Sequence, residues 1–556
     1  MPTDEWPCPV HRLQGPPGTG KTYTLTRSWI PRAVELYGED AVLVCSLTRA
    51  AAHEIGGRAN LPRENVATLH AFAYRALGKP PLAQDKGNVA KWNEIAPHDW
   101  HLTGTSKPGK KDEVDVSTGG ATDGDGLLDR ITIMRSKMIP SKQWEPQLRA
   151  FWQEWLAWKR EHQWLDFTDL IWAPVEFNVP PPGTTKVIVC DEAQDFTHLD
   201  VKLIRYWASY CEMIVMAGDR CQALYSWIGA DPKAFIPDSL PDEEITTLGQ
   251  SYRVPEAVRE YASAWLEQDT DVRRFPYAAR LDDKGKVVKG VVKMKPGLNL
   301  NRVSPLIDEL EARAEEGHRV MVLATCRFQL TRLCSQMKLR GVPFWNPYRE
   351  KEGAWNPMRG GPDRLAGFLR PLRPEIPGDE PWSWDELKRW VHPIRARGTL
   401  RNGAVTEIES RAKHHAEDPS EEDLRLLMVP EAYESMREAA AQESVVPLLD
   451  WYEERMLRAH EGLMRLALAI ARKGDPAKLI EQPKIIVGTF HSVKGGDSDV
   501  VYISPDLGGA AMREWLNHGE PEGRNAIVRA FYVGMTRARK AIALMGATSR
   551  NAVEWI

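Results

Sequence analysis

The feature that most constrains the fold is a glycine-rich octapeptide, GPPGTGKT, at residues 15–22. It has the spacing G-x-x-x-x-G-K-[ST], in which the glycines let backbone N–H groups approach phosphates, the lysine reaches the β- and γ-phosphates, and the last hydroxyl can ligate Mg²⁺. An apolar stretch precedes it and a helix-compatible stretch follows, as the motif requires. The octapeptide therefore predicts ATP binding with Mg²⁺, although it leaves the class of ATPase open. The predicted ATP-binding residues are Gly15, Pro16, Pro17, Gly18, Thr19, Gly20, Lys21 and Thr22.

Six short apolar runs predict strands: AVLVCSL, KVIVCDE, MIVMAGD, VMVLAT, KIIVGTF and DVVYISP. Continuous runs of this length suit central strands of a parallel sheet that is buried on both faces. Helical stretches lie between them, and apolar residues recur at helical spacing in two sets: Trp144, Leu148, Phe151, Trp152, Trp155 and Leu156, and then Leu449, Tyr452, Met456, Leu463, Leu466 and Ile470. Because the strands fall in two groups, before and after about residue 245, we expect two α/β domains.

Composition excludes several classes of protein. The chain has 556 residues, a net charge of −4 and no apolar run near the ~20 residues of a bilayer span. The N-terminus does not read as a signal peptide, so we expect a cytoplasmic protein. The seven cysteines form no CxxC pair and are expected to be reduced thiols, neither disulfides nor zinc ligands. The charge alone neither indicates nor excludes nucleic-acid binding, because binding grooves are local.

Two further motifs carry acidic and aromatic residues. In KVIVCDEAQDF a predicted strand ends at Asp191 and Glu192, which could hold Mg²⁺ and polarise the attacking water, although paired acids can also be a solvated strand end. In MIVMAGDRCQALYSW, Gln222 could sense the γ-phosphate. Tyr225 and Trp227 could form a platform on which bases stack or could pack in a core, and spacing alone favours the core.

Taken together, eight blocks resemble the superfamily 1 helicases of the UvrD/Rep/PcrA type, and they occur in the family order. The blocks are CSLTRAAAHEI, ATLHAFAYRAL, DFTDLI, DEAQD, GDRCQALYSWIGA, LGQSYRVP, TFHSVKGGDSDVVYI and RAFYVGMTRARKAIAL. The resemblance implies an α/β fold of two RecA-like P-loop domains with parallel sheets, each with a mostly helical insertion. The first domain would comprise residues 1–75 and 165–245, with the insertion 76–164 and a flexible loop at 103–126. The second would comprise 246–345 and 480–556, with a short, divergent insertion at 346–479.

The resemblance also implies roles for residues at matching positions. Mg-ATP would be held by Lys21, Thr22 and Asp191, with Glu192 as the general base. The γ-phosphate would be surrounded by Gln222, Arg253 and Arg537, the two arginines acting as arginine fingers. Tyr252 would stack on the adenine, and Asp497 would contact the ribose. The path of single-stranded DNA would be lined by Thr48, His70, Tyr225, Trp227, Thr489 and His491.

The sequence departs from the family pattern at several points. The family has a glutamine block before the P-loop that reads adenine, whereas Gln14 lies in the wrong place for that block. We therefore expect weak adenine selectivity. Asp497 stands where a ribose-contacting Glu is usual, which keeps the carboxylate on a shorter side chain. Leu47 and Arg49 replace an aromatic and an Asn, so one base-stacking contact is expected to be missing.

The function implied by the resemblance is ATP-driven movement along single-stranded DNA in the 3′-to-5′ direction, with separation of duplex strands, in repair or replication. The expected partners are single-stranded DNA and duplexes with a single-stranded tail, the expected free state is a monomer, and no loading partner is defined. Three alternatives stay open: a translocase that displaces bound proteins but unwinds weakly, an RNA-directed superfamily 1 helicase, and a DNA-binding module that depends on nucleotide without hydrolysing it.

Overall fold

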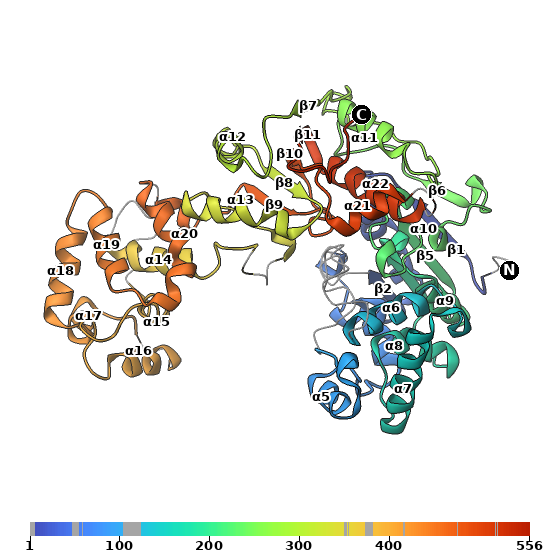
Figure 1. Cartoon of the computed structure of the whole chain (residues 1–556), viewed down its shortest axis with the longest axis horizontal. Coiled ribbons are helices and arrows are strands. Elements are labelled where there is room, and N and C mark those ends of the chain that lie inside the picture. The colour runs from blue at the N-terminus through green and yellow to red at the C-terminus, as the bar shows by residue number, and fades with distance from the viewer. Residues whose placement is uncertain are drawn as a thin grey trace. The chain divides into compact units, whose positions relative to one another are not determined.

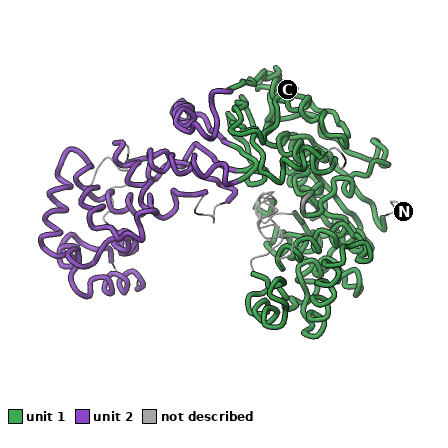
Figure 2. The backbone as a smooth tube through the Cα atoms, in the orientation of Figure 1, with its two compact units in different colours: residues 1–295, 323–326, 489–556 green, residues 296–322, 327–488 purple. Residues whose placement is uncertain are grey.

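The computed structural model describes residues 6–46, 55–57, 59, 61–103, 124–349, 353, 355–372, 382–414, 417–474, 476–517, 519 and 521–556. The chain divides into two compact units (Figure 2). Unit 1 comprises residues 1–295, 323–326 and 489–556, and unit 2 comprises residues 296–322 and 327–488. The predicted domain boundaries at residues 75, 165, 245, 346 and 480 divide the chain differently and stay a prediction.

The first sheet lies in unit 1 and has six parallel strands in the order β3-β2-β4-β5-β1-β6 (Figure 1). Alternate residues of its central strands enter two different cores, so the sheet is buried on both faces. Three of the predicted apolar runs form its strands β2, β4 and β5. The strands are β1 (Val10–Gln14), β2 (Val42–Ser46), β3 (Val66–Ala67), β4 (Val187–Asp191), β5 (Met213–Gly218) and β6 (Ile245–Thr247).

The second sheet has the order β7-β11-β10-β8-β9, and the pairs β7–β11 and β10–β11 are parallel. The other three predicted runs form β8, β9 and β10. Strands β8 and β9 each begin in unit 2 and end in unit 1. The strands are β7 (Val291–Lys295), β8 (Val320–Ala324), β9 (Ile485–Thr489), β10 (Ser498–Ile503) and β11 (Ala538–Met545).

The helices of unit 1 include three that fall in the predicted insertion 76–164 and pack around a core of buried aromatic residues with Trp92 and Trp155 at its centre. Most of the predicted loop 103–126 lies outside the described residues, but residues 124–126 begin α6 instead. The helices are α1 (Lys21–Thr24), α2 (Ile30–Tyr37), α4 (Leu69–Ala76), α5 (Lys86–Ile95), α6 (Gly124–Ser136), α7 (Pro146–His162), α8 (Phe167–Glu176), α9 (His198–Ala208), α10 (Pro232–Phe235), α11 (Glu256–Leu266), α21 (Gly509–Leu516) and α22 (Pro521–Met535).

Unit 2 consists mainly of helices, and those between residues 361 and 472 pack around a large apolar core. The apolar residues from Leu449 to Ile470 belong to two helices, and Met456 lies between them. The helices are α12 (Val303–Glu315), α13 (Arg327–Leu339), α14 (Gly361–Leu369), α15 (Trp384–Val391), α16 (Ala404–Lys413), α17 (Glu421–Leu427), α18 (Pro430–Ala440), α19 (Val446–Glu454) and α20 (Glu461–Arg472). The predicted α/β class with two parallel sheets and helical insertions is confirmed. In the described part of the chain, no helix has the length and apolar character needed to cross a bilayer.

Candidate functional site

The glycine-rich octapeptide connects β1 to α1 at the carboxyl edge of the first sheet. Its start is fixed to β5, because the Gly15 N–H donates to the carbonyl of Gly218 at 3.0 Å. Gly18 and Gly20 have φ values of 76° and 83°, a left-handed conformation that glycine adopts without steric cost. The Lys21 ammonium folds back onto the Gly15 carbonyl at 2.6 Å, so backbone and cation enclose a space suited to phosphates.

Asp191 and Thr22, the two predicted Mg²⁺ ligands, are in direct contact. The Thr22 hydroxyl donates to Oδ2 of Asp191 at 3.0 Å. Burial, with the nearby charge of Glu192, raises the pKa of Asp191 to about 7. A carboxylate and a hydroxyl are oxygen ligands of the kind Mg²⁺ prefers, and a divalent cation would offset the cost of burying this carboxylate. The two side chains therefore fit the predicted Mg²⁺ site, where the ion would neutralise phosphate charge.

Glu192, the predicted general base, lies in a left-handed backbone conformation with φ of 55°. One carboxylate oxygen accepts a hydrogen bond from Gln194 at 2.6 Å and lies 3.4 Å from the ammonium of Lys494. Burial raises the pKa of this carboxyl, but Lys494 and Lys21 outweigh it and bring the pKa to about 2. Glu192 is therefore ionised at neutral pH, as a general base must be.

A chain of hydrogen bonds leads from β1 to the loop before β11. The amide of Gln14 donates to one oxygen of Asp219 at 2.9 Å, and the amide of Gln222 donates to the other at 2.6 Å. The Arg537 guanidinium then donates to the side-chain amide oxygen (Oε1) of Gln222 at 2.9 Å. Gln222 and Arg537, which the resemblance places at the γ-phosphate, are thus in direct contact. Gln14 is fully buried and bonded to Asp219, and the weak adenine selectivity expected from its position stays a prediction.

The segment 251–253 is seated on the octapeptide. The Ser251 hydroxyl donates to the carbonyl of Pro17 at 3.0 Å, and the Tyr252 N–H donates to the carbonyl of Gly18 at 2.8 Å. The Tyr252 side chain is 68% exposed beside the phosphate loop, as a base-stacking residue would be. Arg253 Nε lies 3.5 Å from Asp497, so the predicted ribose contact pairs here with a predicted arginine finger.

The described residues of the predicted DNA path are mostly buried. Tyr225, Thr489 and His491 are each less than a tenth exposed, and the rings of Tyr225 and His491 meet edge to face at 5.8 Å. His70 is half-buried at the start of α4. Thr48 and the side chain of Trp227 lie outside the described residues. The assignment of these six residues to a DNA path stays a prediction.

Lys494 is a site residue that the sequence reasoning did not single out. Its ammonium contacts Asp195, lies 3.4 Å from the Gln222 carbonyl and lies 5.6 Å from the centre of the Tyr225 ring. Lys494 therefore lies against both Asp195 and Glu192 of the DEAQD motif, and also against the predicted γ-phosphate sensor and a residue of the predicted DNA path. Both motifs that meet here, DEAQD and TFHSVKGGDSD, were recognised, but nothing in their spacing indicates that Lys494 and Asp195 pair.

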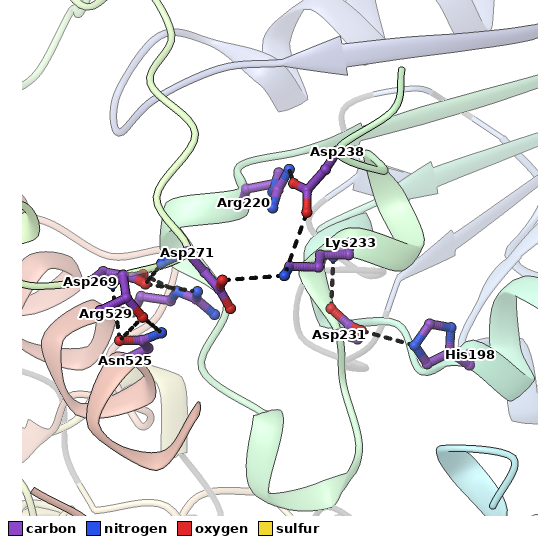
Figure 3. Close-up of polar contacts among 10 residues, drawn as sticks. His198, Arg220, Asp231, Lys233, Asp238, Asp269, Asp271, Asn525 and Arg529 are labelled. Atoms are coloured by element: carbon purple, nitrogen blue, oxygen red, sulfur yellow. Dashed lines mark hydrogen bonds and ion pairs between the residues drawn. The ribbon is translucent and has the colours of Figure 1, made fainter. Parts of the chain in front are cut away.

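Polar contacts fix α22, the helix that leads to Arg537, against the segment after α11 (Figure 3). Arg529 of α22 forms a buried ion pair with Asp269 at 2.6 Å. Two residues on, Asp271 lies 3.2 Å from the Lys233 ammonium, which belongs to α10 beside the first sheet. Residues 269–271 therefore connect the part of unit 1 around the first sheet with the helix that precedes Arg537.

Two comparisons with known proteins agree with this geometry. Residues 11–239 match the protein family described as "UvrD/REP helicase N-terminal domain". A Bacillus subtilis (strain 168) protein named "Putative ATP-dependent DNA helicase YjcD" is 25% identical over 252 residues, which cover 40% of this chain and 32% of that protein. The match thus spans about a third of the relative. The predicted resemblance to the UvrD-like superfamily 1 helicases is confirmed.

Proposed function

We propose that this chain, whose residues 11–239 match the UvrD/REP helicase N-terminal domain family, is an ATP-dependent DNA helicase that moves on single-stranded DNA. The observation that carries the proposal is the hydrogen-bonded chain from Gln14 through Asp219 and Gln222 to Arg537. It links the phosphate loop side of the first sheet to the arginine that the family places at the γ-phosphate. A static binding module has no need of such a link between the two sheets.

In the proposed hydrolysis, Lys21 and the octapeptide backbone hold the β- and γ-phosphates, and Thr22 and Asp191 hold Mg²⁺. Water attacks the γ-phosphorus, its proton passes to the Glu192 carboxylate, and the bond to the β–γ bridging oxygen breaks. Arg253 and Arg537 stabilise the charge that develops on the transferred group. The ionised state of Glu192 at neutral pH supports its role as proton acceptor.

Movement would follow from the nucleotide state. ATP draws the two sheets together through the arginines, hydrolysis lets them part, and alternating grip on DNA turns each cycle into a step. Lys494 supports this coupling, because it contacts Asp195 beside Glu192 and also lies against the Tyr225 ring on the proposed DNA path. The 3′-to-5′ direction rests on the family resemblance alone.

A strand-separation assay tests the proposal. Duplexes with a 3′ tail, a 5′ tail or blunt ends, made of DNA and of RNA, are mixed with the protein and ATP, with the Lys21→Ala variant as control. The proposed function requires ATP-dependent unwinding of the 3′-tailed DNA. Removal of a bound streptavidin block without unwinding would assign a translocase, and unwinding of RNA in preference to DNA would assign an RNA-directed enzyme. ATP-dependent DNA binding without hydrolysis would reduce the chain to a binding module.

A further inference from the structure

The outer edge of the second sheet presents an unusual surface. Strand β7 (Val291–Lys295) pairs with β11 and has no second partner among the described strands (Figure 1). An edge strand leaves alternate backbone N–H and C=O groups available to another strand. Val291 and Met294 on this strand are 43% and 55% exposed.

The preceding turn extends this surface. Leu281 and Val287 are bridged across the turn and are each 42% exposed, so the apolar strip continues from β7 into the segment 281–287. Lysines alternate with these residues at positions 284, 286, 289, 293 and 295. Lys289 is paired with Glu256 at 2.6 Å, whereas the structure gives the ammonium groups of Lys284, Lys286 and Lys293 no carboxylate partner among the described residues.

The edge is held in a fixed conformation. The first two N–H groups of α11, on Glu256 and Ala257, donate to the carbonyls of Val288 and Lys289 at 2.8 Å. Gly290, with φ of 66°, lies so close to Pro255 that a Cβ at this position would come within 2.4 Å of it. The residues directly before β7 are therefore held in place. A partner strand that pairs with β7 would not pay the entropy cost of ordering it.

We propose that β7 and the turn 281–287 form a docking surface, named here the lysine edge, for an acidic extended peptide segment of a partner protein. Such a segment would add as a further strand, using backbone hydrogen bonds for affinity. Successive side chains of a strand point to opposite faces, so Met294 lies on one face of β7 and Lys293 on the other. The carboxylates of the added strand would face Lys293, and its alternate apolar side chains would cover Met294. Charge complementarity selects an acidic partner, and the exposed apolar residues select a peptide over a polyphosphate.

Nucleic acid fits the lysine edge less well. Single strands are bound by aromatic side chains on which bases stack, and the bidentate phosphate contacts come from arginine. Residues 281–295 contain neither an aromatic residue nor an arginine. The lysine edge is thus separate in chemistry from the proposed DNA path.

Fluorescence anisotropy with the full chain tests the proposal. The probes are a labelled octapeptide of alternating Asp and Val, one of alternating Lys and Val, and the acidic peptide with two central prolines, which cannot extend a sheet. Of these three probes, only the acidic peptide without prolines should bind. The triple variant Lys284→Glu, Lys286→Glu and Lys293→Glu should weaken it roughly tenfold or more, since three ion pairs are reversed. The matched variant Lys142→Glu, Lys202→Glu and Lys413→Glu, at exposed lysines elsewhere, should not.

Hydrogen exchange then identifies the mode of binding. The acidic peptide should slow exchange of backbone amides in residues 288–296 and leave α22 unchanged. Equal binding of the proline peptide, equal loss in the matched variant, or no binding at millimolar peptide would overturn the proposal. A loss of affinity for a labelled dT20 oligonucleotide in the lysine-edge variant, with no peptide binding, would assign the edge to nucleic acid instead. ATPase activity should be retained in both triple variants, so the outcome is independent of the proposed helicase function.

Discussion

The ammonium of Lys494 lies 3.4 Å from the carboxylate of Glu192, although 302 residues separate them in the sequence. The lysine belongs to the segment after β9, in the second sheet, and the glutamate follows β4 in the first. This contact lowers the pKa of the half-buried Glu192 carboxyl, and it makes that pKa depend on a residue that follows a strand of the second sheet. A movement that withdraws Lys494 would raise the pKa of Glu192 and change its basicity.

The first prediction follows from that contact. Lys494→Ala should move the acid limb of the kcat/KM pH profile of ATP hydrolysis upward by about 1–3 pH units, because an opposite charge at this distance depresses a carboxyl pKa by that amount. The sign follows from the base being active when deprotonated: a higher pKa removes activity at a higher pH. Lys494→Arg, which keeps the charge, should restore the limb. If the acid limb does not shift in a folded Lys494→Ala protein, Lys494 does not set the pKa of the general base.

The second prediction concerns hydrolysis itself. Glu192→Gln should bind ATP normally but lose turnover by ~10²–10⁴, because an amide does not accept a proton from water. Lys21→Ala should weaken nucleotide binding and abolish activity, since the phosphates lose their cation. Nucleotide binding by calorimetry and phosphate release report the two effects separately. Hydrolysis at the unmodified rate by Glu192→Gln would remove Glu192 from the role of base.

The third prediction concerns the nucleotide base. Gln14 is occupied by Asp219, and the exposed Tyr252 ring would stack on any purine without reading its substituents. The kcat/KM values for ATP and GTP should therefore be comparable. Tyr252→Ala should raise KM for both by a similar factor, while Tyr252→Phe should leave both unchanged. A thousandfold preference for ATP would mean that another group, such as backbone in residues 8–13, reads the adenine.

The strands were predictable from the sequence where they are buried on both faces. All six apolar runs form strands, because a continuous β-branched run has few other stable environments. Strands β1, β3, β6, β7 and β11 were not among those runs, and β7 was missed because it lies at an edge and its sequence, VVKMK, mixes lysine with apolar residues. Helix ends were less predictable: the regular spacing from Leu449 to Ile470 continues across a break between α19 and α20.

The motifs of the candidate site could be predicted from the sequence, but the contacts between residues of the two sheets could not. Spacing indicated Lys21, Thr22 and Asp191, because a phosphate loop and a following acidic strand end have recognisable local patterns. The pairing of Lys494 with Asp195, and the engagement of Asp497 by Arg253, depend on how two sheets pack. No local pattern encodes that packing, so these contacts required the structure.

The fourth prediction is a pH dependence of stability. The Nε2–H of His198 donates to the Asp231 carboxylate at 2.9 Å, and this hydrogen bond raises the pKa of His198. A histidine with a raised folded pKa contributes stability that is fully present below the unfolded pKa of about 6.5 and is lost as pH rises through the folded value. His198→Gln should therefore lower Tm more at pH 6 than at pH 8.5.

The matched control for that prediction is His98→Gln, since His98 is almost fully exposed. Its effect on Tm should be small at both values of pH. Thermal melts of the two variants and the unmodified protein, recorded side by side, measure the difference. A deficit in His198→Gln that is constant with pH would show that the pair acts through packing and not through its charge.

The last prediction concerns the coupling of DNA to ATP. Trp227 lies in the short helical turn Ser226–Ile228, eight residues after Asp219 and five after Gln222. If a base stacks on Trp227, one short segment carries both a DNA contact and the proposed γ-phosphate sensor, Gln222. The binding of DNA and the binding of ATP are then linked reciprocally. Single-stranded DNA should then stimulate ATP hydrolysis strongly. Trp227→Ala should weaken DNA binding by the ~1–3 kcal/mol of a lost stack and uncouple hydrolysis from movement.

Basal hydrolysis distinguishes this role from core packing. A stacking Trp227 does not touch the phosphates, so Trp227→Ala should leave ATP hydrolysis without DNA nearly unchanged. A truncated core tryptophan instead costs ~3–5 kcal/mol of stability, and basal hydrolysis would fall with it. Tyr225→Ala supplies the comparison, because Tyr225 is 6% exposed and packs against His491, so its truncation should lower Tm. If Trp227→Ala melts as early as Tyr225→Ala while DNA affinity per folded molecule is intact, Trp227 belongs to the core, and the coupling to DNA must run through Lys494 instead.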